Sequence, residues 1–336
     1  NYVIHCDIIT QDYYKDKFKM TNQGDLNCWI ISSGLIGCEN QCIGLAEKLN
    51  LDYEIKKINP SILLSIIAPY GIPRKSDETQ APWPDIVIGA GRRTIPYVRY
   101  IKKKSKDSCF TVYLQDPKIN TNNFDLVWAP YHDNLKGDNV ISTLLSPGRV
   151  SNELLRLEKE KWSKELTKLP KPYLTILIGG KSKGFKFSND ECLHVLNSIS
   201  KVIKSGWTPL ISTSRRTPKK LIKSIKSLIA NKPHYLYDNK GNNPYYAFLE
   251  ISDVALVTPD SVNMISETLT ANLSTYIFDL NCKSRKINNF LSSLIKKKYI
   301  KKFEKNIEIF DVKVINATEQ IANHISNTNT HLKSIH

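Results

Sequence analysis

The chain has 336 residues, of which 41% are hydrophobic and 24% are charged, and its formal net charge is +16. This length is enough for two ordinary α/β domains, and the composition is typical of a soluble globular protein. The longest apolar run, residues 62–68, is far shorter than the roughly 20 residues of a membrane span. Residues 1–5 (NYVIH) lack the charged start and apolar body of a signal peptide, so we expect a cytoplasmic protein.

The basic excess has two interpretations. A codon bias towards Lys, Asn and Ile would spread lysines over solvated faces, whereas a functional charge would attract nucleotide-sugars or an anionic membrane surface. Residues 283–305 hold about nine basic residues and one acid, interleaved with Ile, Phe and Leu. They form either an amphipathic helix peripheral to the inner membrane face or an exposed helix with an ordinary core side. We expect no nucleic-acid partner, because no recognition motif accompanies the charge.

The cysteines predict neither disulfides nor a metal site. There are seven of them, scattered along the chain, and no Cys-x-x-Cys pair occurs. This pattern is typical of reduced thiols in a cytosolic protein. We therefore expect no structural metal, and no Asp-rich site for a catalytic divalent metal is recognisable either.

Strands and helices alternate along the first half of the chain. Residues 41–49 have helical spacing, whereas the neighbouring short apolar runs are typical of buried parallel strands. The predicted strands of this half are residues 28–33, 53–58, 85–90, 109–115, 125–129 and 140–144.

The same pattern starts again after a charged helical segment, residues 151–171, which ends at Pro170 and Pro172. We therefore predict an α/β protein with two Rossmann-like, doubly wound domains. The predicted strands of the second half are residues 173–178, 207–213, 234–237, 254–258 and 275–278. The predicted ranges are an N-terminal, acceptor-side domain 1–155, a linker 156–172, a C-terminal nucleotide-sugar domain 173–310 and a helical tail 311–336.

Ligands of open α/β sheets bind beyond the carboxyl ends of the strands, so the loops there carry the candidate site. One loop contains Gly179, Gly180 and Lys181, which can approach a phosphate closely but match neither a dinucleotide fingerprint nor a P-loop. The next contains Ser214, Arg215 and Arg216, and its guanidinium groups suit phosphate oxygens, although a solvated basic turn remains the alternative.

Two further loops of the second half complete the expected donor site. Asn243 lies in an Asn-Pro turn that positions a base or sugar, or is a plain turn. Asp260 or Ser261 caps the helix that follows the strand 254–258, and a helix start attracts a diphosphate. Glu267 lies further along this helix, where its carboxylate can accept hydrogen bonds from ribose hydroxyls; an ordinary capped helix with a surface glutamate is the alternative.

The first half supplies expected acceptor and catalytic residues. Titratable groups at strand ends can act as general bases, so Asp116, His132 and Asp133 are the catalytic candidates. A polar, glycine-containing loop after the first strand and a basic loop after the third are expected on the acceptor side. Their residues are Gly34, Gly37, Asn40 and Gln41 in the first loop, and Gly91, Arg92 and Arg93 in the second.

Taken together, these loops resemble the motifs of the "elongated mitochondria" fission family of plants and its bacterial relatives, which are described as glycosyltransferases. The resemblance runs from about Trp29 to about Phe278. It rests on residues 29–34 (WIISSG) with Gly37 and 39–41 (ENQ), 88–94 (IGAGRRT), 115–117 (QDP), 129–133 (APYHD), 177–180 (LIGG), 213–218 (TSRRTP), 243–245 (NPY) and 257–267 (VTPDSVNMISE).

This resemblance implies a GT-B fold, with two Rossmann-like domains facing across a cleft, and transfer of sugar from a nucleotide-diphosphate donor without metal or other cofactor. The stretch from Asp260 to Glu267 is also similar to the donor signature of the lipid-linked N-acetylglucosaminyltransferase of peptidoglycan synthesis. Pro259 departs from that pattern, because it removes one amide that would contact phosphate. The alternative is a catalytically inactive scaffold of the same fold at a membrane surface. The missing dinucleotide fingerprint disfavours an oxidoreductase.

Overall fold

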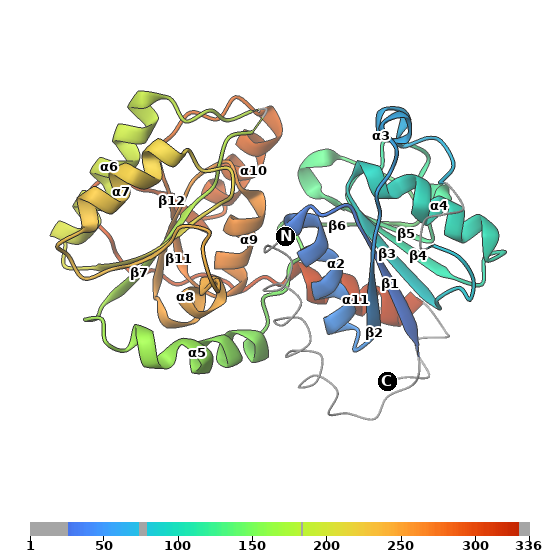
Figure 1. Ribbon diagram of the computed structural model, residues 1–336, viewed down its shortest axis with the longest axis horizontal. Helices are drawn as coiled ribbons and strands as arrows, with labels where there is room; N and C mark the ends of the chain where they lie inside the picture. Colours follow the sequence, from blue (N-terminus) through green and yellow to red (C-terminus); the bar gives the residue numbers. More distant parts are fainter. Residues whose placement is uncertain (1–25, 74–78, 183, 329–336) are drawn as a thin grey trace. The chain divides into compact units, whose positions relative to one another are not determined.

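A computed structural model of the chain describes residues 26–73, 79–182 and 184–328 (Figure 1). The described residues form two compact units, each with one parallel six-stranded sheet. We call residues 26–149 with 316–328 the N-terminal unit, and residues 150–315 the C-terminal unit. The predicted fold class, α/β with two Rossmann-like domains, is confirmed; the cleft expected between the domains stays a prediction.

The sheet of the N-terminal unit has the order β2-β1-β3-β4-β5-β6, and every neighbouring pair is parallel. Its strands are β1 (Asn27–Ser32), β2 (Asp52–Lys57), β3 (Ile86–Ala90), β4 (Phe110–Leu114), β5 (Leu126–Pro130) and β6 (Val140–Thr143). Its helices are α2 (Ile36–Lys48), α3 (Ile62–Ile67), α4 (Ile95–Lys104) and α11 (Ala317–Thr328), with short 3-10 turns at Arg92–Thr94, Thr121–Asn123 and Tyr131–Asp133.

Both faces of this sheet are buried, which explains the continuous apolar runs of its strands. Successive side chains of a strand point to opposite faces. In β1, Ile30 packs with α2 and α11 on one face, while Ile31 packs with α4 on the other. The C-terminal helix α11 therefore completes the core of the N-terminal unit, although it lies last in the sequence.

The C-terminal unit has the strand order β12-β11-β10-β7-β8-β9, again entirely parallel. Helices α6 and α7 pack on one face of this sheet, and α5 and α8 pack on the other. The strands are β7 (Tyr173–Ile178), β8 (Thr208–Thr213), β9 (Tyr235–Tyr237), β10 (Val254–Val257), β11 (Ser274–Ile277) and β12 (Ile300–Lys302). The helices are α5 (Asn152–Leu166), α6 (Asn189–Lys204), α7 (Lys219–Ile229), α8 (Tyr245–Ile251), α9 (Val262–Thr270) and α10 (Arg285–Lys296).

The domain ranges differ from those predicted. The units separate at residues 149 and 150, and the expected linker 156–172 lies within the C-terminal unit, where α5 buries Trp162 and Leu166 against the sheet. The expected tail 311–336 contains α11, which belongs to the N-terminal unit. The sequence suggested a linker because this segment is highly charged and is followed by two prolines. In the structure, most of these charged residues lie on the solvated face of α5.

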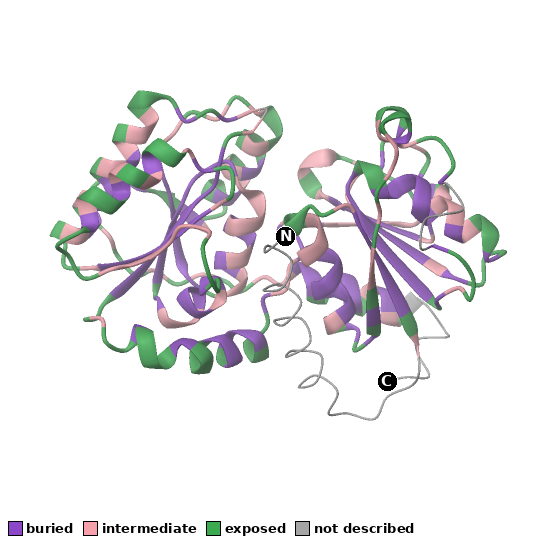
Figure 2. Ribbon diagram, in the orientation of Figure 1, coloured by how far each residue is buried: buried purple, intermediate pink, exposed green. Residues whose placement is uncertain are grey.

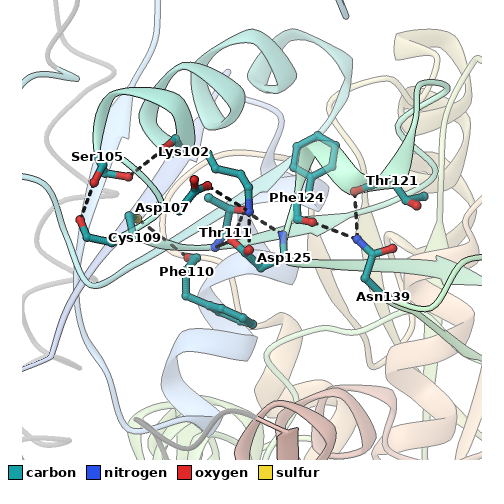
Figure 3. A network of polar contacts seen from close by, with 11 residues as sticks. Lys102, Ser105, Asp107, Cys109, Phe110, Thr111, Thr121, Phe124, Asp125 and Asn139 are labelled. Carbon is teal, nitrogen blue, oxygen red and sulfur yellow. Dashed lines mark hydrogen bonds and ion pairs between the residues drawn. The ribbon is translucent and has the colours of Figure 1, made fainter.

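A polar network stabilises the amino end of β5, and Figure 3 shows it from close by. The Asp125 carboxylate accepts hydrogen bonds from the backbone amide of Thr111 at 2.8 Å and from the Thr111 hydroxyl at 2.7 Å, and it pairs with Lys102 of α4. Further along, the Asn139 side chain donates to the carbonyls of Thr121 and Phe124. These contacts fix the loops at the sheet edge opposite the candidate site, so their role is structural.

The basic segment 283–305 contains α10, whose Phe290 and Leu294 are buried in the core of its own unit. The interpretation as an exposed helix with an ordinary core side therefore describes α10. None of the helices in the described ranges combines the length and the apolar character that a bilayer crossing requires.

Candidate functional site

The strand order of the C-terminal unit brings three of the predicted loops together. Strand β7 lies between β10 and β8, and all three strands run in the same direction. Their carboxyl ends therefore meet at one edge of the sheet. The glycine loop after β7 is flanked by the arginine turn after β8 on one side and by the Thr258–Ser261 turn after β10 on the other.

The two glycines are required by close approach of the flanking turns. A side-chain carbon at Gly179 would lie 2.3 Å from the Asp260 carboxylate, and one at Gly180 would lie 2.4 Å from the backbone of Arg216. Their amides are also engaged within the protein. The Gly179 amide donates to the Thr258 hydroxyl at 2.8 Å, and the Gly180 amide donates to Asp260 Oδ2 at 3.0 Å. These amides join the loops to one another, so they are not the phosphate cradle that the sequence suggested.

Asp260 belongs to the frame of the site. Its side chain is buried, and burial raises the pKa of its carboxyl group, although its hydrogen bonds and the charge of Arg216 act in the opposite direction. The second oxygen, Oδ1, makes no hydrogen bond with any residue that the structure describes. We interpret Asp260 as a positioning residue that joins the β10 turn to the glycine loop.

The arginine turn presents its guanidinium groups to solvent. Arg215 and Arg216 are both exposed. Arg216 is oriented by the glycine loop, because its Nη1 donates to the Lys181 carbonyl at 3.3 Å and its carbonyl accepts from the Lys181 amide at 3.2 Å. Ser214 holds the turn, since its hydroxyl accepts from the Arg216 amide. The turn thus combines a fixed backbone with cations available to a ligand.

Of the two residues that the sequence offered as caps of this helix, Ser261 caps α9 and Asp260 does not. The Ser261 hydroxyl accepts a hydrogen bond from the Met264 amide at 3.4 Å. The amides at the start of α9 that precede Met264 have no intrahelical acceptor, and the positive end of the helix dipole lies there. Pro259 is buried in the turn and contributes no amide.

Glu267 lies one and a half turns into α9, where it is largely shielded from solvent. Its Oε2 accepts a hydrogen bond from the Tyr245 hydroxyl at 2.5 Å. Burial raises the pKa of Glu267 to about 7, and the Tyr245 hydrogen bond opposes that rise. Asn243 is exposed, and its Oδ1 accepts a hydrogen bond at 3.1 Å from the amide of Tyr245, the first residue of α8.

Tyr245 therefore joins two loops that the sequence presented separately, the Asn-Pro turn and the helix that carries Glu267. Tyr245 was not among our predicted site residues. It is the last residue of the Asn-Pro-Tyr motif, and this motif was the one signal in the sequence that could have pointed to it. A buried tyrosine hydroxyl needs a partner, and Glu267 supplies it.

In the N-terminal unit, α2 begins at Ile36, so three of the four first-loop candidates lie on a helix. Gly37 and Asn40 occupy its first turns, and Gln41 is buried. We predicted a polar loop through residue 41, and the structure corrects this. Gly34 is in the preceding turn with φ of +78°, and its amide donates to the Ser32 hydroxyl, which itself contacts the Glu39 carboxylate.

The basic turn after β3 lies next to this helix, because β3 pairs with β1. Gly91, with φ of +89°, lies beside Cys38 of α2. Arg92 and Arg93 are both exposed, and Arg92 Nη2 donates to the Ile66 carbonyl at 2.9 Å. Arg93 is thus the more available cation of the two.

The three catalytic candidates lie after the neighbouring strands β4 and β5. Asp116 accepts a hydrogen bond from the Lys118 amide at 2.9 Å and forms an ion pair with the Lys118 side chain. This contact raises the pKa of Lys118, and the charge of Asp133 adds to the rise. His132 Nε2 lies 3.9 Å from Asp133 Oδ1, too far for a hydrogen bond. The structure thus places the three at the carboxyl ends of two adjacent strands, and Asp116 is paired with a lysine.

Gln115 was outside our predicted site residues. Its φ of +135° is unusual for a residue with a side chain, and its Nε2 donates to the Cys38 sulfur at 3.4 Å. Backbone strain of this kind is often found at functional positions. The Gln-Asp-Pro motif contained it, but no sequence pattern indicates a strained backbone angle.

Within the ranges that the structure describes, no group of three or more His, Cys, Asp or Glu side chains is arranged to hold a metal ion. Burial raises the pKa of the thiols of Cys38, Cys42 and Cys109, so these groups are poor nucleophiles.

The fold and the loops define a protein with two Rossmann-like domains, whose polar residues gather at the carboxyl edges of the sheets. Residues 36–328 match the family model described as Mitochondrial fission ELM1, and the chain belongs to this family. The match extends 50 residues beyond Phe278, where the resemblance seen in the sequence ended, and so includes α10 and α11.

Two curated relatives are 28% identical to the chain. The alignment with "Uncharacterized protein RP120" of Rickettsia prowazekii covers 88% of this chain and 97% of that protein. The alignment with mitochondrial fission protein ELM1 of Arabidopsis thaliana covers 66% of this chain and 57% of that protein. Among solved structures, a UDP-GlcNAc 2-epimerase from Methanocaldococcus jannaschii is similar with a TM-score of 0.49 and 13% identity, over 90% of this chain and 99% of that one.

Proposed function

We propose that the chain binds a nucleotide-diphosphate sugar at the carboxyl edge of β7, β8 and β10 and transfers the sugar to an acceptor, as a metal-independent glycosyltransferase of the GT-B type. One observation carries the proposal. The turn with Arg215 and Arg216 and the start of α9 flank the same glycine loop, so cations and helix amides converge on one edge.

The diphosphate would lie between these two groups. Two exposed guanidinium groups can form paired hydrogen bonds with phosphate oxygens, each worth roughly 1.5–3 kcal/mol. The helix dipole would add about 0.3–1 kcal/mol. In this arrangement the contribution of Gly179 and Gly180 is that they have no side chain, because any side chain would push the flanking turns apart.

The ribose would lie beside Glu267. Its Oε2 is fixed by Tyr245, and this bond orients the carboxyl group for further hydrogen bonds with sugar hydroxyls. Ribose hydroxyls would replace the solvation that burial removes from the carboxylate. The Asn243 turn, joined to Glu267 through Tyr245, would border the same part of the nucleotide.

The reaction would be a displacement at the anomeric carbon. An acceptor hydroxyl forms the new bond, the bond to the diphosphate oxygen breaks, and the hydroxyl proton passes to a base. Asp116, His132 and Asp133 are the candidate bases, and Gly34, Gly91 and Arg93 lie at neighbouring strand ends for the acceptor. Arg215, Arg216 and the start of α9 would offset the charge of the leaving diphosphate, so no bound metal is needed.

Isothermal titration with UDP, GDP, ADP and CDP, each with an excess of chelator, tests the proposal. We expect at least one of them to bind, and Arg215→Gln with Arg216→Gln to weaken that binding about tenfold or more. Arg156→Gln is the control, because this arginine of α5 is also exposed and lies outside the proposed site, where it pairs with Glu160. If no nucleotide binds in the millimolar range, or if the control weakens binding as much as the test variant, the proposed site is wrong.

The alternative function is a non-catalytic scaffold of the same fold. The engaged amides of Gly179 and Gly180 favour it, because they remove phosphate contacts that a nucleotide enzyme would use. The name of the Arabidopsis relative refers to mitochondrial fission and not to sugar transfer. Membrane binding by a chain that binds no nucleotide would support this alternative.

A further inference from the structure

The N-terminal unit carries an apolar surface that is not covered by any described residue. It consists of α3 and the loop that follows it, and we call it the α3 surface. Ile62 is 82% exposed, Leu63 is 67% exposed and Ile66 is 66% exposed. Tyr70, Ile72 and half of Ile67 continue it. Figure 2 shows α3 as almost entirely exposed, and Figure 1 shows it beyond the strand ends of its unit.

The α3 surface is part of the fold, because its backbone is held at several points. Ser61 caps the helix by accepting from the Leu64 amide at 3.2 Å, and Leu64 is buried in the core. A side-chain carbon at Gly71 would lie 2.6 Å from the Leu64 side chain, so the loop folds closely back on the helix. Apolar side chains are thus presented to solvent from a fixed frame.

The segment that forms this surface is itself uncharged, and the charged side chains that hydrogen-bond to its backbone are arginines. No residue from Ile58 to Pro73 carries a charge. Two arginines from α4 and its preceding turn hold the segment: Arg92 Nη2 donates to the Ile66 carbonyl at 2.9 Å, and Arg99 Nη1 donates to the Pro69 carbonyl at 3.3 Å. Arg92 and the neighbouring Arg93 are exposed. Guanidinium groups therefore border the exposed aliphatic side chains.

We propose that the α3 surface docks on an anionic lipid bilayer, with the aliphatic side chains entering the acyl boundary and Arg92 and Arg93 contacting the head groups. Contiguous exposed apolar side chains mark interaction sites, and interfacial helices combine such a face with basic residues at its border. The composition favours lipid over a protein partner. The apolar parts of protein interfaces are enriched in aromatic residues and Met, whereas the exposed apolar side chains of this surface are aliphatic apart from Tyr70.

Sedimentation with vesicles tests this surface. The full-length chain is mixed with phosphatidylcholine vesicles that contain either no anionic lipid or about one third phosphatidylglycerol. We expect binding to the anionic vesicles that weakens with salt. Replacing Leu63 and Ile66 with asparagine should lower the partition coefficient about tenfold or more. Replacing Arg92 and Arg93 with glutamine should lower it about fivefold for each charge removed.

The controls separate this surface from the rest of the chain. Leu193→Asn removes an apolar side chain of α6 that is 57% exposed and lies outside the α3 surface, and it should leave the partition coefficient unchanged. Lys296→Gln with Lys297→Gln tests the basic segment 283–305 and should change it much less than the arginine pair does. Nucleotide titration of the Leu63 and Ile66 variant should match the unaltered chain, so a failure of the nucleotide site is seen separately.

Three results would overturn the inference. The unaltered chain could fail to bind anionic vesicles. The variant of Leu63 and Ile66 could bind as well as the unaltered chain, which would place lipid binding elsewhere. Finally, the unaltered chain could be a dimer that this variant converts to a monomer, which would make the α3 surface an interface between copies. Circular dichroism and thermal melting check that each variant is folded.

Discussion

Replacing Glu267 with glutamine tests the burial of this carboxyl group, because glutamine keeps its shape and an acceptor for the Tyr245 hydroxyl but cannot ionise. Burial raises the pKa of Glu267 from its ordinary value of 4.5 to about 7. The folded protein therefore holds this proton more tightly than the unfolded chain does. The resulting stability is fully present below pH 4.5 and is lost as the pH rises through about 7.

The magnitude follows from the same values. A pKa raised from 4.5 to about 7 corresponds to about 3 kcal/mol of stability that is lost once the carboxyl group is ionised. We expect Glu267→Gln to equal the unaltered protein in its free energy of unfolding near about pH 4, and to exceed it by about 2–3 kcal/mol at about pH 8. Other titrating groups contribute equally to both proteins, so they cancel in the difference.

Urea unfolding at a series of pH values measures this difference, with tryptophan fluorescence and circular dichroism compared to check for a single transition. Glu308→Gln is the control, because its side chain is 72% exposed and its partner Lys301 lies 3.7 Å away. It should alter stability far less at every pH. A Glu267→Gln difference that is the same in acid and in base, or a variant that is less stable at high pH, would refute the burial argument.

Two further substitutions test the packing on which the candidate site depends. Gly180→Ala would place a side-chain carbon 2.4 Å from the backbone of Arg216, so we expect a loss of about 1–3 kcal/mol, measured by urea unfolding, together with weaker nucleotide binding. Arg149→Ala would leave the Glu47 carboxylate without the two hydrogen bonds, at 2.6 and 3.1 Å, that it accepts from this guanidinium; we expect a loss of about 3 kcal/mol and unchanged nucleotide binding. Stability equal to the unaltered protein would contradict either argument.

Much of the fold could be predicted from the sequence. All eleven predicted strands are present, because parallel strands buried on both faces appear as continuous apolar runs. The twelfth, Ile300–Lys302, was missed because it is a three-residue edge strand with two lysines. The start of α2 was missed as well, since Gly34 and Gly37 suggested a loop and the N-cap residue, Leu35, provides no side-chain cap.

The candidate site was predictable in its position but not in its contacts. Asp260 or Ser261 was expected to cap a helix, and Ser261 does so; this was predictable because a cap depends on residues that are close in sequence. The sequence could not indicate that the Gly179 and Gly180 amides are engaged by Thr258 and Asp260, since about 80 residues separate the partners. It also could not pair Tyr245 with Glu267.

The sequence by itself determined the α/β class, the strands and the polar loops, because periodicity and helix capping are local properties of the chain. The tertiary structure decided the rest. It placed α11 in the core of the N-terminal unit, and it brought the arginine turn and α9 to either side of one glycine loop. It also left most of the apolar residues of α3 exposed, although they belong to the longest apolar run of the sequence. Strand order and side-chain burial depend on contacts between distant residues, and such contacts exist only in the folded chain.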